Sequence, residues 1–252
     1  GQVALSWTAP SSDGGAAISG YEVSKDNGVT WVTASTSTSH TFTGLTNGTE
    51  YTFKVRAVNS AGTGTEASAA ATPTANVCKI GATEYATLDG ALVTLVDNTP
   101  ATITLLQNIT NTDGISLSRK KLTIDLNGKI LTVNNSTGIG IEMDLFSELN
   151  ITGPGNLNVC GNSIGLYLNQ SSFAAAENVM VDIASDNGFG LGTDTGCSVS
   201  MHGNISGARR GIGAGTGNTI TVDGTVTSTG TGSENHAVRL GGRGNTVQVG
   251  NV

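Results

Sequence analysis

A short motif that returns about every 25 residues constrains the fold of this chain more than any other feature. The motif is a small residue, an apolar residue, any residue and a second apolar residue. Its small residues are Gly114, Gly140, Gly165, Gly188, Gly211 and Ala237, at intervals of 26, 25, 23, 23 and 26 residues. A repeat of 20–50 residues is typical of a solenoid, in which each repeat buries its apolar face against its neighbours.

The apolar residues of each repeat alternate with other residues, which predicts strands with one buried face. The first strand of each repeat carries the pairs Ile115/Leu117, Ile141/Met143, Leu166/Leu168, Phe189/Leu191, Ile212/Ala214 and Val238/Leu240. A second strand carries Ile124/Leu126, Leu149/Ile151, Val199/Met201, Ile220/Val222 and Val247/Val249. Val179, Val181 and Ile183 form either the second or the third strand of the repeat that begins at Gly165. We expect a single buried ladder of Ile115, Ile141, Leu166, Phe189, Ile212 and Val238.

The composition narrows both the fold and the function. Leucine-rich repeats share this period, but the repeats here are rich in Thr, Ser, Gly and Asn, which favours a parallel β-helix with coils about 4.8 Å apart. The chain has 12 Lys and Arg residues and a net charge of −7, which argues against nucleic-acid binding. No apolar run approaches about 18 residues, so we expect no membrane insertion.

Residues 1–74 lack this repeat and alternate in short runs between turn clusters, which predicts a β-sandwich. Residues 5–10 (Leu-Ser-Trp-Thr-Ala-Pro), Gly20-Tyr21, Leu45 with Tyr51 six residues later, and residues 59–62 (Asn-Ser-Ala-Gly) resemble a bacterial fibronectin type III domain. The resemblance implies an immunoglobulin-like sandwich that begins at strand B, without strand A, and serves as a spacer. It places Trp7 and Tyr21 in the core, Trp31 beside strand C′, and the Tyr51 hydroxyl on the backbone near Leu45.

Residues 78–81 (Cys-Lys-Ile-Gly), 84–88 and 103–109 resemble the start of right-handed, pectate-lyase-like β-helices in large bacterial cell-surface proteins. Apolar residues at helical spacing predict a helix of about three turns over residues 85–96, with Thr87 or Asp89 as its cap. This helix would cover the open first coil. The expected fold is therefore all-β: a fibronectin type III domain over 1–74, then a right-handed parallel β-helix of six to seven coils over 75–252.

One turn of the β-helix is the best candidate for ligand binding. It gathers charged and titratable residues from neighbouring coils, and these can hold an acidic sugar through arginine–carboxylate pairs. The alternative is an ordinary solvated turn. The residues are Asp186, Arg209, Arg210, His236 and, on the next strand, Arg239.

A second candidate is catalytic. Counting from the repeats sets His202 against Asp223 on adjacent coils, a pair suited to acid–base chemistry, although both also precede a glycine as turn residues do. The acids Asp125, Asp144, Asp182 and Asp194 are scattered, without the carboxylate pair of a glycosidase. The three cysteines, Cys78, Cys160 and Cys197, lack zinc-binding spacing, so we expect free thiols, with one disulfide as the alternative, and neither metal nor cofactor.

These observations favour a non-catalytic extracellular or cell-surface protein, structural or adhesive, with its signal peptide outside this fragment. Surface glycans or other proteins are the expected partners. One alternative is a polysaccharide-active enzyme, a lyase or a hydrolase, or a carbohydrate-binding module. Another is a subunit of a filament or phage fibre that self-associates through its chain ends.

Overall fold

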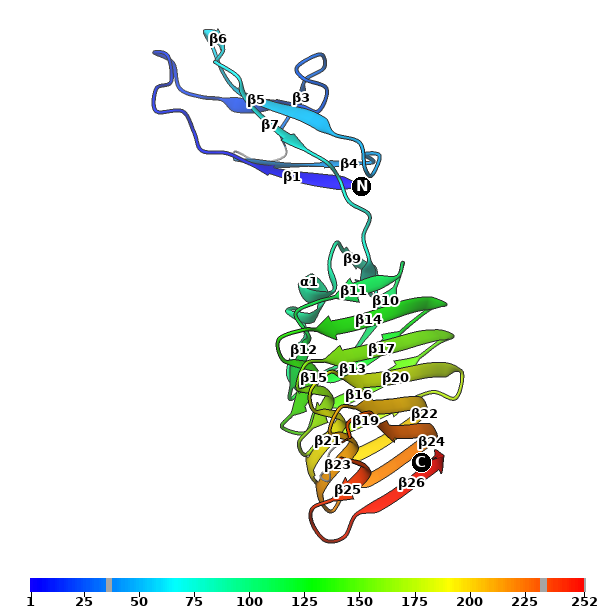
Figure 1. Cartoon of the computed structure of the whole chain (residues 1–252). Helices are drawn as coiled ribbons and strands as arrows, with labels where there is room; N and C mark the ends of the chain where they lie inside the picture. Colours follow the sequence, from blue (N-terminus) through cyan, green and yellow to red (C-terminus); the bar gives the residue numbers. More distant parts are fainter. Residues whose placement is uncertain (35–37, 232–234, 252) are drawn as a thin grey trace. The chain divides into compact units, whose positions relative to one another are not determined.

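The chain consists of two compact units, Gly1–Asn76 and Val77–Val252. They are seen in a computed structural model that describes residues 1–34, 38–231 and 235–251 (Figure 1). The division lies two residues beyond the boundary expected from the sequence. In the described ranges no helix is long and apolar enough to cross a membrane.

The N-terminal unit is a sandwich of two antiparallel sheets. One sheet pairs β1 (Gln2–Ser6) with β4 (Ser39–Thr43). The other contains β3 (Val32–Thr33), β2 (Gly20–Ser24), β5 (Tyr51–Asn59), β6 (Gly62–Thr63) and β7 (Ala67–Ala71). The core cluster between the two sheets contains the buried residues Val23, Phe42, Leu45 and Phe53. In the described part of the chain, β1 pairs with β4.

The aromatic residues singled out in this unit lie close to their expected places. Trp7 follows the last residue of β1 and is only partly buried, with its ring centroid 5.5 Å from that of the buried Tyr21. Trp31 precedes β3, and the Arg56 guanidinium lies 3.9 Å from its ring centroid. The Tyr51 hydroxyl accepts a hydrogen bond of 3.1 Å from a backbone amide next to Leu45, which confirms the tyrosine corner.

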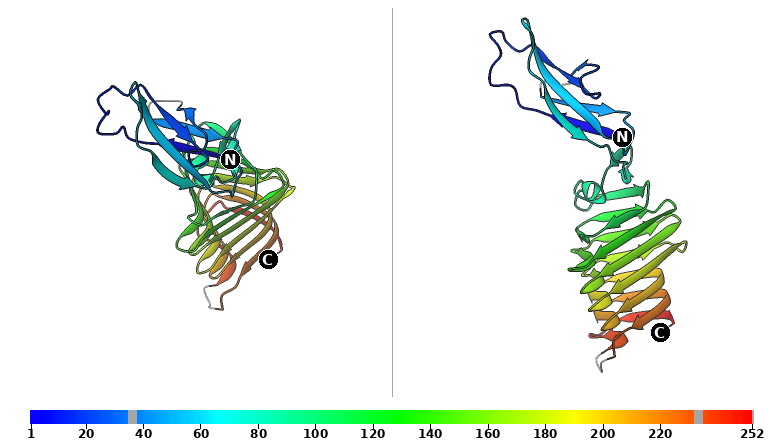
Figure 2. Two further views of the ribbon diagram at one scale, coloured as in Figure 1. Left: turned by 90° about the horizontal axis from the view of Figure 1, so that it is seen from above. Right: turned by 45° about the horizontal axis from the view of Figure 1, so that its top comes forward.

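The C-terminal unit is a β-solenoid of about six turns, in which each coil contributes strands to parallel sheets (Figure 2). The first strands of the coils are β12 (Ile115–Ser118), β15 (Ile139–Asp144), β18 (Ile164–Leu168), β21 (Phe189–Thr195), β23 (Arg210–Thr216) and β25 (His236–Leu240). The second strands stack on β10 (Pro100–Leu105) as β13 (Lys121–Asp125), β16 (Glu148–Thr152), β19 (Ser172–Ala175), β22 (Ser198–Gly207), β24 (Thr219–Ser228) and β26 (Thr246–Asn251).

A third series of strands completes the early coils. It contains β11 (Ile109–Asn111), β14 (Lys129–Asn135), β17 (Gly155–Gly161) and β20 (Val179–Ser185). The strand β22 is ten residues long, and its two halves pair with β19 and β20, so it belongs to both the second and the third series. Val179, Val181 and Ile183 therefore lie in the third strand of their coil, while Phe173 occupies the second.

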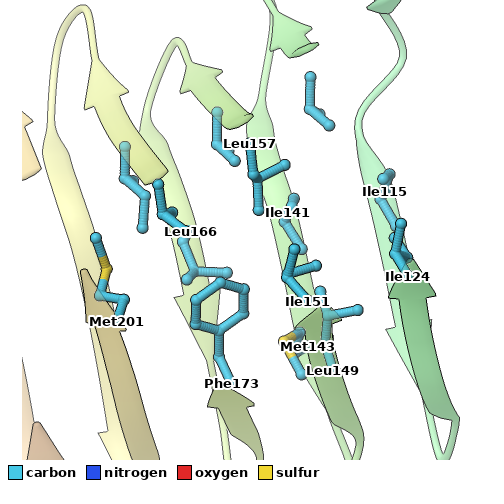
Figure 3. Close-up of a cluster of buried hydrophobic side chains, with 14 of the residues drawn as sticks. Ile115, Ile124, Ile141, Met143, Leu149, Ile151, Leu157, Leu166, Phe173 and Met201 are labelled. Carbon is cyan, nitrogen blue, oxygen red and sulfur yellow. The ribbon is translucent and has the colours of Figure 1, made fainter. Parts of the chain in front are cut away.

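Apolar side chains fill the solenoid in ladders that run from coil to coil (Figure 3). The ladder of the first strands contains Ile115, Ile141, Leu166, Leu191, Ile212 and Val238. That of the second strands contains Leu122, Leu149, Phe173, Val199, Ile220 and Val247. Because parallel strands align like residues, these positions are buried from coil to coil, except in the last coil, where Val238 and Val247 are only partly buried.

The structure corrects one member of the expected ladder. Leu191, not Phe189, pairs with Leu166 and Ile212, so the small residue that starts this repeat is Gly190 rather than Gly188. A shift of two residues keeps the alternation of a strand intact, and the sequence pattern therefore fits either register. A Cβ would collide with a carbonyl oxygen at either glycine, that of Ser163 at position 188 and that of Ser206 at position 190, so the register is seen in the strand pairing and not in the glycines.

The cap of the solenoid is smaller than expected. The helix α1 covers Leu88–Leu92, five residues rather than three turns, and Thr87 caps it by accepting a 3.0 Å hydrogen bond from the Gly90 amide. The Thr94 hydroxyl donates to the Ala91 carbonyl, a local bond that competes with helix continuation. A hairpin of β8 (Cys78–Ile80) and β9 (Thr83–Tyr85) pairs antiparallel with β10 and completes the cover. All three cysteines are free thiols.

Candidate functional site

The first strands of the coils present a solvent-facing surface, here called the outward face. Two columns of residues run along it, each built from direct neighbours on successive coils. The first column is Ile139, Ile164, Phe189, Arg210 and His236. The second is Ser116, Glu142, Tyr167, Gly192, Gly213 and Arg239.

Two glycines in the second column make room for aromatic rings. A Cβ at Gly213 would lie 3.3 Å from the ring of Phe189, and a Cβ at Gly192 would lie 3.3 Å from the ring of Tyr167. Each ring therefore leans over the glycine of the following coil. The Arg210 guanidinium carbon lies 4.7 Å from the centroid of the Phe189 ring, within the range of a cation–π contact.

Beside Phe189 the outward face is hollowed into a groove of about 380 Å³, here called the arginine groove. Gly213 lies between Gly192 of the coil before and Arg239 of the coil after, and Arg210 borders the same groove. The full lining is Phe189, Thr193, Arg210, Gly213, Ala214, Gly215, Arg239 and Gly241. Residues 130–208 contain neither Lys nor Arg, so the cations of these coils are concentrated where the groove lies.

The same face is acidic in its earlier coils. Burial raises the pKa of the half-buried Tyr167, and the nearby carboxylates of Asp194, Asp144 and Glu142 raise it further. These three acids and Tyr167 are called the acidic cluster below. Asp144 on β15 and Asp194 on β21 belong to coils separated by that of β18, and both nevertheless raise the pKa of Tyr167. A sequence signal existed, because Glu142 and Asp144 are two residues apart on one strand and so share its face.

The structure separates the residues of the predicted ligand-binding turn. Arg210 and Arg239 line the arginine groove, and His236 is the direct neighbour of Arg210 on β25. Arg209 is exposed and lies outside the groove lining. The Asp186 carboxylate accepts a weak hydrogen bond of 3.7 Å from the Cys160 thiol on β17, also outside the groove.

The predicted contact between His202 and Asp223 is present. The two residues are direct neighbours on β22 and β24, and His202 Nδ1 lies 2.9 Å from Asp223 Oδ2. Their side chains are 44% and 79% exposed, and the pair belongs to a different sheet from the outward face. Gly203 after His202 has a φ of 140°, whereas Gly224 after Asp223 lies outside the positive-φ region, so the turn interpretation fits His202 and not Asp223. Among the described residues, no three His, Cys, Asp or Glu side chains are grouped to hold a metal ion.

A larger groove, of about 680 Å³, lies in the N-terminal unit between the loop after β1 and the β5–β6 hairpin. One of its lining residues, Asn59, already bridges these segments. The Asn59 amide donates to the carbonyls of Asp13 and Ala16, and its oxygen accepts from the amides of Ala61 and Gly62. Loops line much of this groove, and it does not bring two arginines together as the arginine groove does.

Comparison with known proteins identifies the N-terminal unit. The family model "Fibronectin type III domain" matches residues 1–74. Exoglucanase B of Cellulomonas fimi is 42% identical over 79 residues, which is 31% of this chain and 7% of that enzyme. Exoglucanase A of the same bacterium is 49% identical over 69 residues, 27% of this chain and 8% of that enzyme. Both alignments have about the length of this one domain. Residues 1–74 are therefore a fibronectin type III domain, and a β-solenoid follows it.

Proposed function

We propose that this chain is part of a non-catalytic extracellular protein, in which the fibronectin type III domain is a spacer and the solenoid is a rigid structural or adhesive rod. The observation that carries this proposal is the interior of the solenoid. Buried apolar ladders run through its coils in register, which makes the solenoid stiff. Its coils differ from one another mainly in their outward-facing residues. The similarity of the first domain to parts of bacterial exoglucanases supports an extracellular, cell-surface setting.

The partners of the acids on the solenoid strands support a structural role. Glu148 forms a 2.9 Å ion pair with Lys121 of the preceding coil. The Asp182 carboxylate accepts a 2.9 Å hydrogen bond from Asn204 of the following coil. Such contacts between coils stabilise the stack and occupy carboxylates that a hydrolase would keep for its substrate.

A second candidate, a polysaccharide-active enzyme, is favoured by the acidic cluster on the outward face. Glycosidases use two carboxyl groups on opposite sides of the scissile bond, with a separation that decides the stereochemical outcome. Glu142, Asp144 and Asp194 supply more than one carboxylate near a single exposed surface. The candidate is thus specific enough to be tested residue by residue.

The test is a turnover screen of the intact chain on pectin, alginate, cellulose and xylan, read as new reducing ends and as the absorbance of unsaturated uronates. We expect no product above the protein-free control after prolonged incubation. Product formation would overturn the proposal. Its loss in Glu142→Gln and Asp144→Asn would assign the activity to the acidic cluster, and its loss in His202→Ala would assign it to the His202–Asp223 pair.

A further inference from the structure

We propose that a hollow beside the cap helix α1 binds the side-chain ammonium of a lysine from a partner protein. The hollow, here called the cap pocket, has a volume of about 270 Å³ and is lined by residues 86–89 and 108–113 together with Val77. It therefore lies between the start of α1 and the strand β11, both at the N-terminal end of the solenoid (Figure 1). The cap pocket is separate from the outward face, and its ligand is independent of the non-catalytic role proposed above.

The cap pocket contains a buried hydrogen-bond acceptor without a partner, the Oδ1 atom of Asn111. Asn111 is only 6% exposed, and its Oδ1 has no hydrogen-bond partner in the described structure. Turning the amide over does not remedy this, because Asn111 Nδ2 donates a 3.0 Å hydrogen bond to Asp89 Oδ1 and a flip would set two oxygens against each other. Since a buried acceptor is costly to leave unpaired, Oδ1 marks a place for a donor that this chain does not supply.

The charges around the cap pocket favour a cation as that donor. Asp89 and Asp113 line the pocket, and its lining contains no Lys, Arg or His. The hydrogen bond between Asp89 and the Asn111 amide holds a carboxylate beside the free Oδ1 atom. A positive group at this place meets both acceptors together. An ammonium group offers three N–H donors and no acceptor, which matches such a pair.

The size and the lining of the pocket favour a lysine over a metal ion. A hollow of about 270 Å³ holds about nine water molecules at roughly 30 Å³ each, far more room than a single ion needs. Calcium gathers about six to eight oxygens around one point, whereas no three acidic, His or Cys side chains of the described residues are grouped to hold a metal. Val77, Leu88 and Ile109 give the pocket an apolar part, on which the methylene stem of a lysine can pack.

A strand edge beside the pocket favours a lysine within a protein chain over a free amine. The strand β11 stands at the end of its sheet and pairs with β14, so among the described strands it has no neighbour on its other side. All residues of β11 line the cap pocket. Unpaired strand edges accept extended peptide segments through main-chain hydrogen bonds. A segment that lies along this edge can bring a lysine side chain to Asp89 and Asn111.

The test uses the peptide acetyl-Gly-Lys-Gly-amide and proton–nitrogen correlation NMR spectra of the whole chain. The side-chain amide signals of Asn111 are identified by their absence from the spectrum of Asn111→Ala. We expect these signals to shift on titration with a dissociation constant on the order of 1 mM, as a single charge-assisted contact gives in a solvated site. The same peptide with norleucine in place of lysine keeps the stem without the charge, and it should bind at least tenfold more weakly.

Two variants of surface acids form a matched pair for the same titration. Asp89→Asn keeps an oxygen for the Asn111 amide and removes the charge, so it should weaken binding of the lysine peptide about tenfold. Glu177→Gln removes one charge from an exposed residue outside the cap pocket, and it should change the affinity less than about twofold. Circular dichroism should report the same fold for both variants and for the unmodified chain.

Several outcomes would overturn the proposal. Three of them are unshifted Asn111 signals with the lysine peptide, equal affinity for the norleucine peptide, and equal weakening by Asp89→Asn and Glu177→Gln. A larger shift of the Asn111 signals with calcium chloride than with the lysine peptide at the same concentration would assign the cap pocket to a metal ion instead. Tighter binding of the free diamine cadaverine than of the lysine peptide would assign it to a small amine instead of a protein.

Discussion

Truncation of Leu191 to alanine should destabilise the solenoid by about 3–5 kcal/mol, while truncation of Phe189 should cost only about 1 kcal/mol. Leu191 is fully buried between Leu166 and Ile212. The hydrogen-bonded coils on both sides hold these neighbours apart, so the cavity cannot collapse. The loss of stability therefore lies in the upper part of the range measured for Leu→Ala substitutions. Phe189 is half-exposed, and its removal loses chiefly its contact with Arg210.

The two tryptophans allow the two units to be followed separately. Trp7 and Trp31 both lie in the N-terminal domain, so indole fluorescence reports that domain alone. Far-ultraviolet circular dichroism in guanidinium chloride is dominated by the strands of the solenoid. Leu191→Ala should lower the midpoint seen by circular dichroism and leave the fluorescence midpoint unchanged. Equal destabilisation by Phe189→Ala and Leu191→Ala would refute the register described here.

Three further changes have expected results. Thr193 is buried in the column of Leu168 and Ala214, and its hydroxyl lacks a hydrogen-bond partner in the described structure, so Thr193→Val should raise the free energy of unfolding by about 1 kcal/mol in the same denaturation assay. Tyr51→Phe removes the acceptor of the tyrosine corner and should lower the stability of the N-terminal domain by about 1 kcal/mol, visible in fluorescence and not in the solenoid transition. Burial raises the pKa of the Cys78 thiol from 9.0 to about 11. The thiolate therefore forms more readily in the unfolded chain than in the folded one. The contribution of Cys78 to the free energy of unfolding is complete below pH 9 and is lost as the pH rises through 11. Cys78→Ala should flatten this alkaline loss in thermal melts.

The solenoid could be predicted from the sequence because the apolar ladders determine both the length of the repeat and the alternation of apolar with other residues. It also found the contact of His202 with Asp223, since counting from turn glycines sets residues on neighbouring coils side by side. It misplaced Phe189 because Gly188 and Gly190 both start a run of alternating residues. The strand pairing settles the register, because neither glycine leaves room for a Cβ.

The outward face shows where sequence reasoning stops. Arg210 and Arg239 were identified as one patch, but the groove between them depends on Gly213 and on a ring that leans across coils. The nearness of Asp194 to Tyr167 likewise follows from stacking, because residues far apart in sequence become neighbours only once the register is known. The helix α1 came out shorter than its apolar spacing suggested, since local hydrogen bonds end it after Leu92.

A crystal structure of the chain tests the central claim most directly, a solenoid whose apolar ladders stack in the register described here. We predict Leu191 buried between Leu166 and Ile212, with Phe189 on the outward face. Burial of Phe189 in the ladder in place of Leu191 would contradict it.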